Sequence, residues 1–287
     1  MTVKNDVLNR YLFDGKHARG ELVQLSHTYQ QIIDLHEYPS GVQTLLGELV
    51  AATCLLTATL KFQGEITVQL QGDGPIGYMS VNGDHNQNMR GIARLTEPTE
   101  GKFLRDLIGK GTMVITIRPE KGEAYQGVVA LDEDNLADCL VHYFEVSEQI
   151  PTKIWLFSHA DNTQVAGSLI QLLPDSDDKE KQQSDFEHLC QLTNTIKAEE
   201  IFTLDAKTLL YRLYHQEDVR LFEPQPVSYQ CSCSEEKCLT AIAQVAPSEL
   251  KSIIEEQGCV TMTCDYCLTT YKFNETKIDC FINDTNH

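Results

Sequence analysis

Two stretches near the N-terminus place apolar residues at the spacing of a helix face. Residues 22–34 and 42–60 repeat apolar side chains three and four positions apart, so each predicts a helix. The second is the most apolar stretch of the chain, although Gln43, Glu48 and several threonines interrupt it. We therefore expect it to be buried inside a folded domain and not to span a membrane.

Alternating apolar and polar residues then predict a group of strands. These strands are residues 66–71, 76–81, 113–118 and 125–131. The turn residues at 72–75 and 119–122 separate the two members of each pair, so each pair predicts a hairpin. Residues 135–148 predict a helix, while 154–157 and 165–172 predict further strands or a short helix. Strands grouped with strands favour an α+β fold over repeated βαβ units.

The composition changes after Pro174. Residues 175–185 contain five acidic residues, two lysines and no apolar residue, which predicts a solvated linker. Apolar spacing then predicts one helix around residues 186–192 and another that begins at Asp205 as its N-cap and ends near His215. These short amphipathic helices are marginal alone and need a surface on which to pack.

The tail has a pattern of its own. Residues 235–244 and 248–257 predict two short helices, the second stopped by Gly258, and residues 260–262 and 270–273 predict two strands. With so few large apolar side chains, this segment would barely fold unaided, and a bound metal would stabilise it. We predict an α+β chain in three parts: a mixed-sheet N-terminal domain with flanking helices at 1–174, an acidic and then helical linker at 175–230, and a small zinc-binding domain at 231–287.

Four cysteines of the tail have the spacing of metal ligands. Cys231 and Cys233 form a C-x-C pair, and thirty residues later Cys264 and Cys267 form a C-x2-C pair. Two such pairs can wrap four sulfurs around one tetrahedral Zn²⁺. The close C-x-C thiolates can also oxidise to each other, and a disulfide cannot serve as two thiolate ligands. We therefore predict a site that holds zinc when reduced and loses it when oxidised.

Alternatives to this switch remain open. The zinc could be purely structural in a scaffold protein, or Cys264 and Cys267 could serve a thiol–disulfide oxidoreductase, although no βαβ pattern precedes them. Two structural disulfides are disfavoured in a cytosolic protein. The other six cysteines are Cys54, Cys139, Cys190, Cys238, Cys259 and Cys280. Cys54 and Cys139 are predicted core residues, Cys238 and Cys259 are predicted spectator thiols, and the sequence assigns no role to Cys190 or Cys280.

The charge balance excludes some partners. The chain has 23 Lys and Arg residues against 42 Asp and Glu residues, a net charge of −19. Phosphate binding requires a basic face, so we expect neither nucleic acid nor an anionic membrane as the main partner. Residues 1–13 lack the apolar core of a signal peptide, which predicts a cytoplasmic protein. In that compartment ten cysteines suggest metal or redox chemistry.

The sequence contains no convincing enzyme signature. The stretch 72–77 matches G-x-G-x-x-G, but Pro75 and the alternation after it predict a hairpin where a dinucleotide site needs a helix. The nine histidines are scattered and form no H-x3-H pair. No nucleophile, base and orienting group can be assembled from the sequence, so we predict that the protein is not an enzyme.

The chain resembles the heat-shock protein 33 family, the redox-regulated holdase chaperones of bacteria, along essentially its whole length. Besides the cysteine signature, the matching stretches are Arg19-Gly20-Glu21-Leu22, Gln69-Leu70-Gln71-Gly72-Asp73-Gly74-Pro75, Arg90-Gly91, Ser147-Glu148-Gln149-Ile150-Pro151-Thr152 and Leu213-Tyr214-His215. One departure is Ser168, where the family usually has glycine. We expect this change to be local and without functional weight.

The resemblance implies a mechanism. It implies that the reduced protein carries one Zn²⁺ on the four tail cysteines and is inactive. Oxidation by peroxide with heat, or by hypochlorous acid, would form the disulfides Cys231–Cys233 and Cys264–Cys267, after which zinc leaves and the tail and linker unfold. The uncovered apolar surface would then bind unfolding client proteins without ATP, and the active form would be a homodimer.

Overall fold

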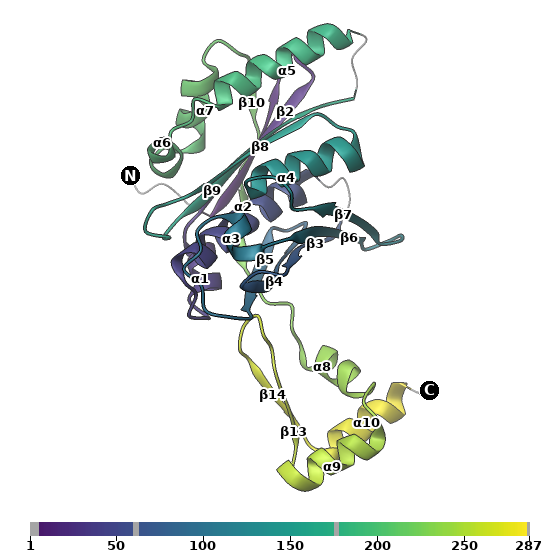
Figure 1. The fold of residues 1–287 in the computed structure, drawn as a ribbon. Coiled ribbons are helices and arrows are strands. Elements are labelled where there is room, and N and C mark those ends of the chain that lie inside the picture. The colour runs from purple at the N-terminus through teal and green to yellow at the C-terminus, as the bar shows by residue number, and fades with distance from the viewer. Residues whose placement is uncertain (1–5, 60–62, 175–177, 286–287) are drawn as a thin grey trace. The chain divides into compact units, whose positions relative to one another are not determined.

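Two six-stranded sheets form the framework of the larger part of the protein (Figure 1). The computed structural model describes residues 6–59, 63–174 and 178–285. The chain divides into two compact units, Met1–Gln230 and Cys231–His287, and each is described by itself below. Both units contain helices and strands that do not alternate as βαβ repeats, which confirms the predicted α+β class.

The first sheet is antiparallel throughout and has the strand order β10-β1-β2-β9-β8, with β11 also paired to β1. Its strands are β1 (Val7–Phe13), β2 (Ala18–Leu25), β8 (Thr152–Ser158), β9 (Val165–Leu172), β10 (Val219–Leu221) and β11 (Gln225–Pro226). The helix predicted over residues 22–34 is wrong in its first half, because residues 18–25 form β2 and only His27–Ile33 form helix α1. β2 lies between two strands and is buried on both faces, so its apolar run lacks the alternation of a half-buried strand.

The second sheet contains both predicted hairpins. Its order is β12-β5-β4-β3-β6-β7, and every pair is antiparallel except β12 with β5. The strands are β3 (Gly64–Gly72), β4 (Ile76–Asp84), β5 (Asn88–Leu95), β6 (Gly111–Pro119), β7 (Tyr125–Ala130) and β12 (Ser228–Tyr229). The short helix α3 (Leu104–Ile108) precedes β6. The dinucleotide-like glycine stretch lies in the β3–β4 turn, as the sequence predicted.

Helix α2 (Ser40–Thr59) is the central element between the two sheets, and it confirms the predicted apolar helix up to Thr59. Leu60, the predicted last residue, lies outside the described residues. By length and composition α2 alone among the described helices could cross a membrane, but 78% of its most apolar window is buried. Apolar residues cover nearly its whole circumference because both sheets pack on it.

A second helical stretch follows β7 in the same core. Helix α4 (Leu136–Tyr143) begins where Asn135 caps it, by accepting a hydrogen bond from the Asp138 backbone N–H. The helix predicted over residues 135–148 is confirmed as far as Tyr143. Its last turn widens into a π-helix, Phe144–Glu148, and ends at Gln149 in the left-handed region with φ of 54°.

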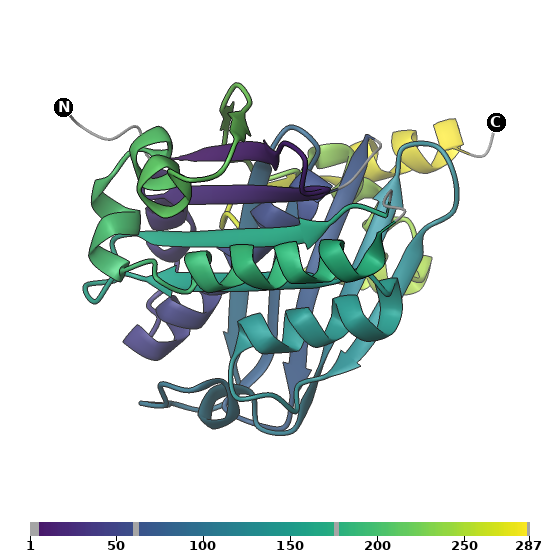
Figure 2. The same ribbon diagram turned by 90° about the horizontal axis from the view of Figure 1, so that it is seen from above.

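A helical layer formed by α5 (Lys179–Thr193), α6 (Ala198–Thr203) and α7 (Ala206–Tyr214) covers the face of the first sheet opposite α2 (Figure 2). The solvated linker predicted over residues 175–185 is wrong from Lys179 onward, because the exposed polar residues there form the first turns of α5. Residues 175–177 lie outside the described part. The predicted N-cap of α7 is confirmed, since Asp205 accepts a hydrogen bond from the Thr208 N–H.

Long-range polar contacts fasten this helical layer to the sheet. Gln24 on β2 donates to the carbonyl oxygens of Ile201 and Leu204 at 2.6 and 2.9 Å. The indole of Trp155 on β8 donates to Asn194 at 2.7 Å. Lys16, in the β1–β2 turn, forms an ion pair with Asp185 at 2.9 Å. The helical layer is therefore part of the larger unit, and it packs on an apolar face of the first sheet.

The smaller unit combines three helices with one hairpin. Its elements are α8 (Glu235–Ile242), α9 (Pro247–Gln257), β13 (Val260–Thr263), β14 (Thr270–Phe273) and α10 (Glu275–Thr285). The two predicted helices, the two predicted strands and the stop at Gly258, with φ of 80°, are confirmed; α10 was not predicted. Among the residues whose burial the structure describes, its apolar core contains six buried residues: Leu239, Ile242, Leu250, Val260, Phe273 and Ile278.

Candidate metal centre

Two segments bring the four tail cysteines together. Cys231 and Cys233 lie in the extended chain that leads into α8, and Cys264 and Cys267 lie in the turn between β13 and β14. In that turn the Cys264 N–H donates to the Thr269 carbonyl, and the Leu268 N–H donates back to the Cys264 carbonyl. Leu268 adopts a φ of 57°, which closes the turn and presents both sulfurs on one side.

The sulfur positions fit one tetrahedral metal ion. The four Sγ atoms all lie within 4.8 Å of one another. The Cys231–Cys264 and Cys233–Cys267 sulfur distances are 3.7 and 3.4 Å. A tetrahedron with metal–sulfur bonds of about 2.3 Å, the zinc–thiolate length, has edges of about 3.8 Å. The predicted set therefore comes together, and it can hold a metal ion.

Two hydroxyl groups contact the sulfurs of the cluster, and no sequence pattern identified them. The hydroxyl of Tyr271 lies 3.2 Å from Cys233 Sγ, and that of Thr269 lies 3.2 Å from Cys267 Sγ. A metal-bound thiolate carries no proton, so each hydroxyl must be the donor when the ligand is ionised. Both residues belong to the β13–β14 hairpin, and the hairpin register aims their side chains at the sulfurs.

The thiols of the C-x2-C pair differ in acidity without a metal. Burial raises the pKa of Cys264 to about 12. Burial also acts to raise the pKa of Cys267, but the hydrogen bond with Thr269 and the neighbouring thiols outweigh it and lower that pKa to about 6. Cys267 is therefore the sulfur of this pair that ionises first when no metal holds it.

The other cysteines lie apart from the cluster of four that can hold a metal. Cys54 and Cys139 are fully buried in the core around α2, as predicted, and burial raises the pKa of both thiols. Cys190 is half-buried on α5, and burial raises its pKa to about 11. Cys280 is exposed on α10. No disulfide joins any of the cysteines in the described residues.

Comparisons with known proteins agree on one family. The family model described as Hsp33 protein matches residues 6–274. A 33 kDa chaperonin of Colwellia psychrerythraea is 66% identical over 286 residues, covering 98% of this chain and 99% of its own. The 33 kDa chaperonin of Shewanella sediminis is 54% identical over 284 residues, covering 99% and 98%.

A solved structure shares the fold. The crystal structure of the 33 kDa chaperonin of Thermotoga maritima, a heat shock protein 33 homologue, matches with a TM-score of 0.81 at 22% identity and covers 98% of this chain and 99% of its own. At that identity the likeness concerns the fold alone. The sequence relatives and the family model carry the assignment of the family.

Proposed function

Since the chain belongs to the Hsp33 family of chaperones, we propose that it is a cytoplasmic, redox-regulated holdase that keeps unfolding proteins from aggregating under oxidative stress. The observation that carries the proposal is the four-sulfur cluster in a unit with a very small apolar core. Such a unit depends on its metal for folding, so oxidation of the sulfurs that hold the metal would unfold it.

In the reduced state, Cys231, Cys233, Cys264 and Cys267 would hold one Zn²⁺. Four thiolates in a closed tetrahedral arrangement are the donor set of structural zinc sites. When bound, zinc would supply charge neutralisation for the thiolates and a cross-link between the C-x-C segment and the hairpin. The hydroxyls of Tyr271 and Thr269 would orient two of the sulfurs and draw charge from them.

Oxidation would remove the ligands. One thiolate attacks a peroxide oxygen and becomes a sulfenic acid while hydroxide leaves; a second thiolate then attacks the sulfenic sulfur, forms the S–S bond and releases a second hydroxide. Two thiolates are thus oxidised by two electrons, and one peroxide is reduced to two hydroxide ions. Proximity does not select the pairing, because all four sulfurs are close. The proposed pairs, Cys231–Cys233 and Cys264–Cys267, rest on the family resemblance.

Once the cysteines that hold the zinc are oxidised, the smaller unit would lose its fold. The segment 175–230, the proposed redox-sensitive linker, would then loosen. The sheet face under α5–α7 is the apolar surface that this segment covers. Buried there are Tyr11, Phe13, Leu22 and Ile170 of the sheet, together with Leu189, Ile201 and Leu209 of the helices. Uncovering this face would expose a continuous apolar surface suited to unfolded chains.

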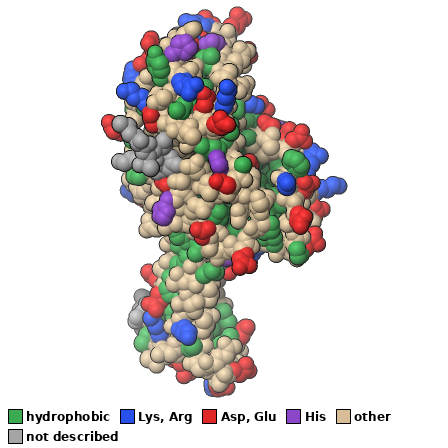
Figure 3. Space-filling view, turned by 90° about the vertical axis from the view of Figure 1, so that its left-hand side faces the viewer, with side chains coloured by type: hydrophobic (Ala, Val, Ile, Leu, Met, Phe, Trp, Pro, Cys, Tyr) green, Lys and Arg blue, Asp and Glu red, His purple; other side chains and the backbone are tan. Residues whose placement is uncertain are grey.

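The partners would be unfolded client proteins and, in the oxidised state, a second copy of the chain. The net charge of −19 favours neither nucleic acid nor an anionic membrane, and it supports solubility when apolar surface becomes exposed. Acidic and basic side chains are interspersed over the face of the larger unit shown in Figure 3. No catalytic role is proposed for any residue.

The proposal is tested by oxidising purified zinc-loaded protein with peroxide at elevated temperature. We expect zinc release, measured with a chromogenic chelator, to accompany the gain of aggregation suppression, measured by light scattering of a denatured client. The reduced zinc form should suppress little. Equal suppression by both forms would contradict redox control, retention of zinc would favour an inert structural site, and turnover in insulin reduction would favour an oxidoreductase.

Tyr271→Phe is expected to make the switch more sensitive to peroxide. The variant removes a hydroxyl that donates to Cys233, so that thiolate keeps more charge and becomes a better nucleophile. Zinc release should be a few-fold faster at equal peroxide, followed by stopped-flow with the chelator. Tyr211→Phe, at an exposed position on α7, is the control. An unchanged or slower rate in Tyr271→Phe would show that the hydroxyl does not restrain the sulfur.

A further inference from the structure

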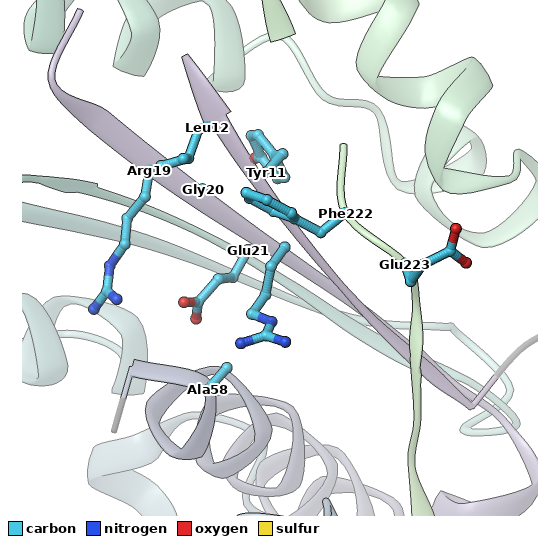
Figure 4. Close-up of a pocket in the computed structure, with 9 residues that line it drawn as sticks. Tyr11, Leu12, Arg19, Gly20, Glu21, Ala58, Phe222 and Glu223 are labelled. Atoms are coloured by element: carbon cyan, nitrogen blue, oxygen red, sulfur yellow. The ribbon is translucent and has the colours of Figure 1, made fainter. Parts of the chain in front are cut away.

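A cavity of about 570 Å³ lies against the β1–β2 hairpin of the larger unit (Figure 4). Its walls come from β1, β2, the last turn of α2 and the segment between β10 and β11. The Arg19-Gly20-Glu21 part of a stretch that the sequence singled out forms one wall, and the proposed redox switch assigns it no role. Gly20 is explained by packing, since a Cβ there would lie 2.2 Å from the Tyr11 ring. Packing does not explain the charged residues on either side of it.

Glu21 carries a buried carboxyl oxygen that has no hydrogen-bond partner in the described part of the chain. The residue is 1% exposed, and among the described residues its Oε2 atom has no hydrogen-bond partner. Figure 4 shows the carboxylate pointing away from β2 toward Ala58 at the end of α2, on the cavity side of the sheet. An unsatisfied buried acceptor destabilises a fold, so its presence in a cavity wall indicates that something else supplies the donor.

Two guanidinium groups share this wall with the carboxyl group. Arg10 lies directly opposite Glu21 in the β1–β2 register, and Arg19 lies two residues before Glu21, so the three side chains are on one face of the sheet. Arg19 is held in place by two hydrogen bonds to Gln171 Oε1, at 3.1 and 2.6 Å. Burial raises the pKa of Glu21 to about 7, although Arg19 and Arg10 act to lower it.

The remaining walls are largely apolar. Phe222, Leu12 and Ala58 line the cavity beside the charged groups. The backbone N–H of Phe222 donates to the Arg10 carbonyl at 2.9 Å, which fixes this aromatic wall to β1. Small-molecule sites have this composition: apolar walls with a few convergent polar groups.

We propose that this cavity binds a small zwitterion of the amino-acid type, with its ammonium group on Glu21, its carboxylate on Arg10 and Arg19, and its apolar side chain against Phe222. A simple anion would leave the Glu21 oxygen without a donor, and a simple cation would face two guanidinium groups. A free amino acid carries an ammonium group and a carboxylate on the same carbon. The cavity wall likewise places a carboxylate next to two guanidinium groups. Internal polypeptide backbone carries neither, so the site is distinct from the surface proposed for client proteins.

The test is calorimetric titration of the reduced, zinc-loaded full-length protein at pH 8 with L-leucine and L-phenylalanine. Each amino acid is compared with two analogues; for leucine these are 4-methylpentanoate, which lacks the ammonium group, and 3-methylbutylamine, which lacks the carboxylate. We expect the amino acids to bind and each analogue to bind at least about tenfold more weakly, the loss typical of one charged hydrogen bond. Absence of binding at millimolar concentration, or equal binding of 4-methylpentanoate, would overturn the proposal.

Variants of the residues that line the cavity test whether the ligand binds there. Glu21→Gln keeps the shape of the side chain but removes its charge, and Arg10→Gln removes the charge of an exposed residue; each should weaken binding about tenfold. Glu65→Gln, exposed on β3, is the matched control and should bind normally. If Glu21→Gln does not fold, as circular dichroism would show, Arg10→Gln alone decides. Normal binding by Arg10→Gln would overturn the proposal.

The pH dependence provides an independent readout. Besides Glu21, the charged groups that line the cavity are Arg10, Arg19 and Glu223, and Glu223 points away from the carboxylate in Figure 4. Because Glu21 loses its charge below a pKa of about 7, affinity should fall between pH 8 and pH 6, and it should not fall in Glu21→Gln. A pH-independent affinity in the unmodified protein would contradict a role for the Glu21 charge.

Discussion

Replacing Cys231 and Cys233 together with serine is expected to abolish tight zinc binding and to unfold the smaller unit. The variant removes two of the four sulfurs that lie within 4.8 Å of one another. Structural zinc contributes about 10 kcal/mol to the folding of such modules, far more than six buried apolar residues can replace. Residues 231–287 should therefore lose their dispersed amide signals in NMR spectra while the larger unit keeps its own.

The matched control for this loss is the Cys259→Ser and Cys280→Ser double variant. It also removes two thiols from the smaller unit, but neither belongs to the cluster of four. Metal analysis of anaerobically purified protein should give one zinc per chain for the control and none for the cluster variant. Unchanged zinc stoichiometry after loss of Cys231 and Cys233 would contradict the ligand assignment.

Leu209→Ala is expected to loosen the α5–α7 layer and to make the reduced protein suppress aggregation. Leu209 is fully buried between α7 and the first sheet, and truncating a buried leucine costs about 2–5 kcal/mol. The layer is held by one modest apolar face and a few polar contacts, so a loss of this size should raise the population in which the sheet face is exposed. Hydrogen exchange of α5–α7 should accelerate while α2 stays protected.

Tyr211→Ala is the control, because Tyr211 is on the same helix but 72% exposed. It should change neither exchange nor light scattering of a heat-denatured client under reducing conditions. If Leu209→Ala accelerates exchange without any gain in aggregation suppression, the covered sheet face is not the client-binding surface. The experiment thus separates release of the layer from what the uncovered surface does.

The elements that the sequence predicted well are those with local signals. Asp205 and Gly258 mark helix ends through their own backbone and side-chain preferences, and both are where the pattern placed them. The helix predicted at residue 22 failed because burial on both faces removes the alternation that identifies a strand. Residues 179–185 were predicted as linker because all their side chains are polar, yet the turns of α5 that they form are exposed and need no apolar residue.

The candidate site divides in the same way. The spacing of Cys231, Cys233, Cys264 and Cys267 predicted a four-sulfur cluster because short loops force such pairs to face one ion. The hydroxyls of Tyr271 and Thr269 were missed because their contact with sulfur depends on the hairpin register. Ser168, the departure from the family pattern, is buried in β9 opposite Leu22, a neighbour that only the sheet supplies.

The sequence by itself determined the sulfur cluster, the net negative charge, the helix caps and the family, because each depends on residues close together in the chain or on overall composition. The tertiary structure decided that α5–α7 cover one face of the first sheet, and that Glu21 faces a cavity with Arg10 and Arg19. The contact between Gln24 and Leu204 joins residues 180 positions apart, and Phe222, which lines the cavity, is hydrogen-bonded to Arg10 at the other end of the larger unit's sequence. These contacts are stabilised by burial and pairing between elements that are distant in the sequence. The local spacing of residues therefore does not predict them.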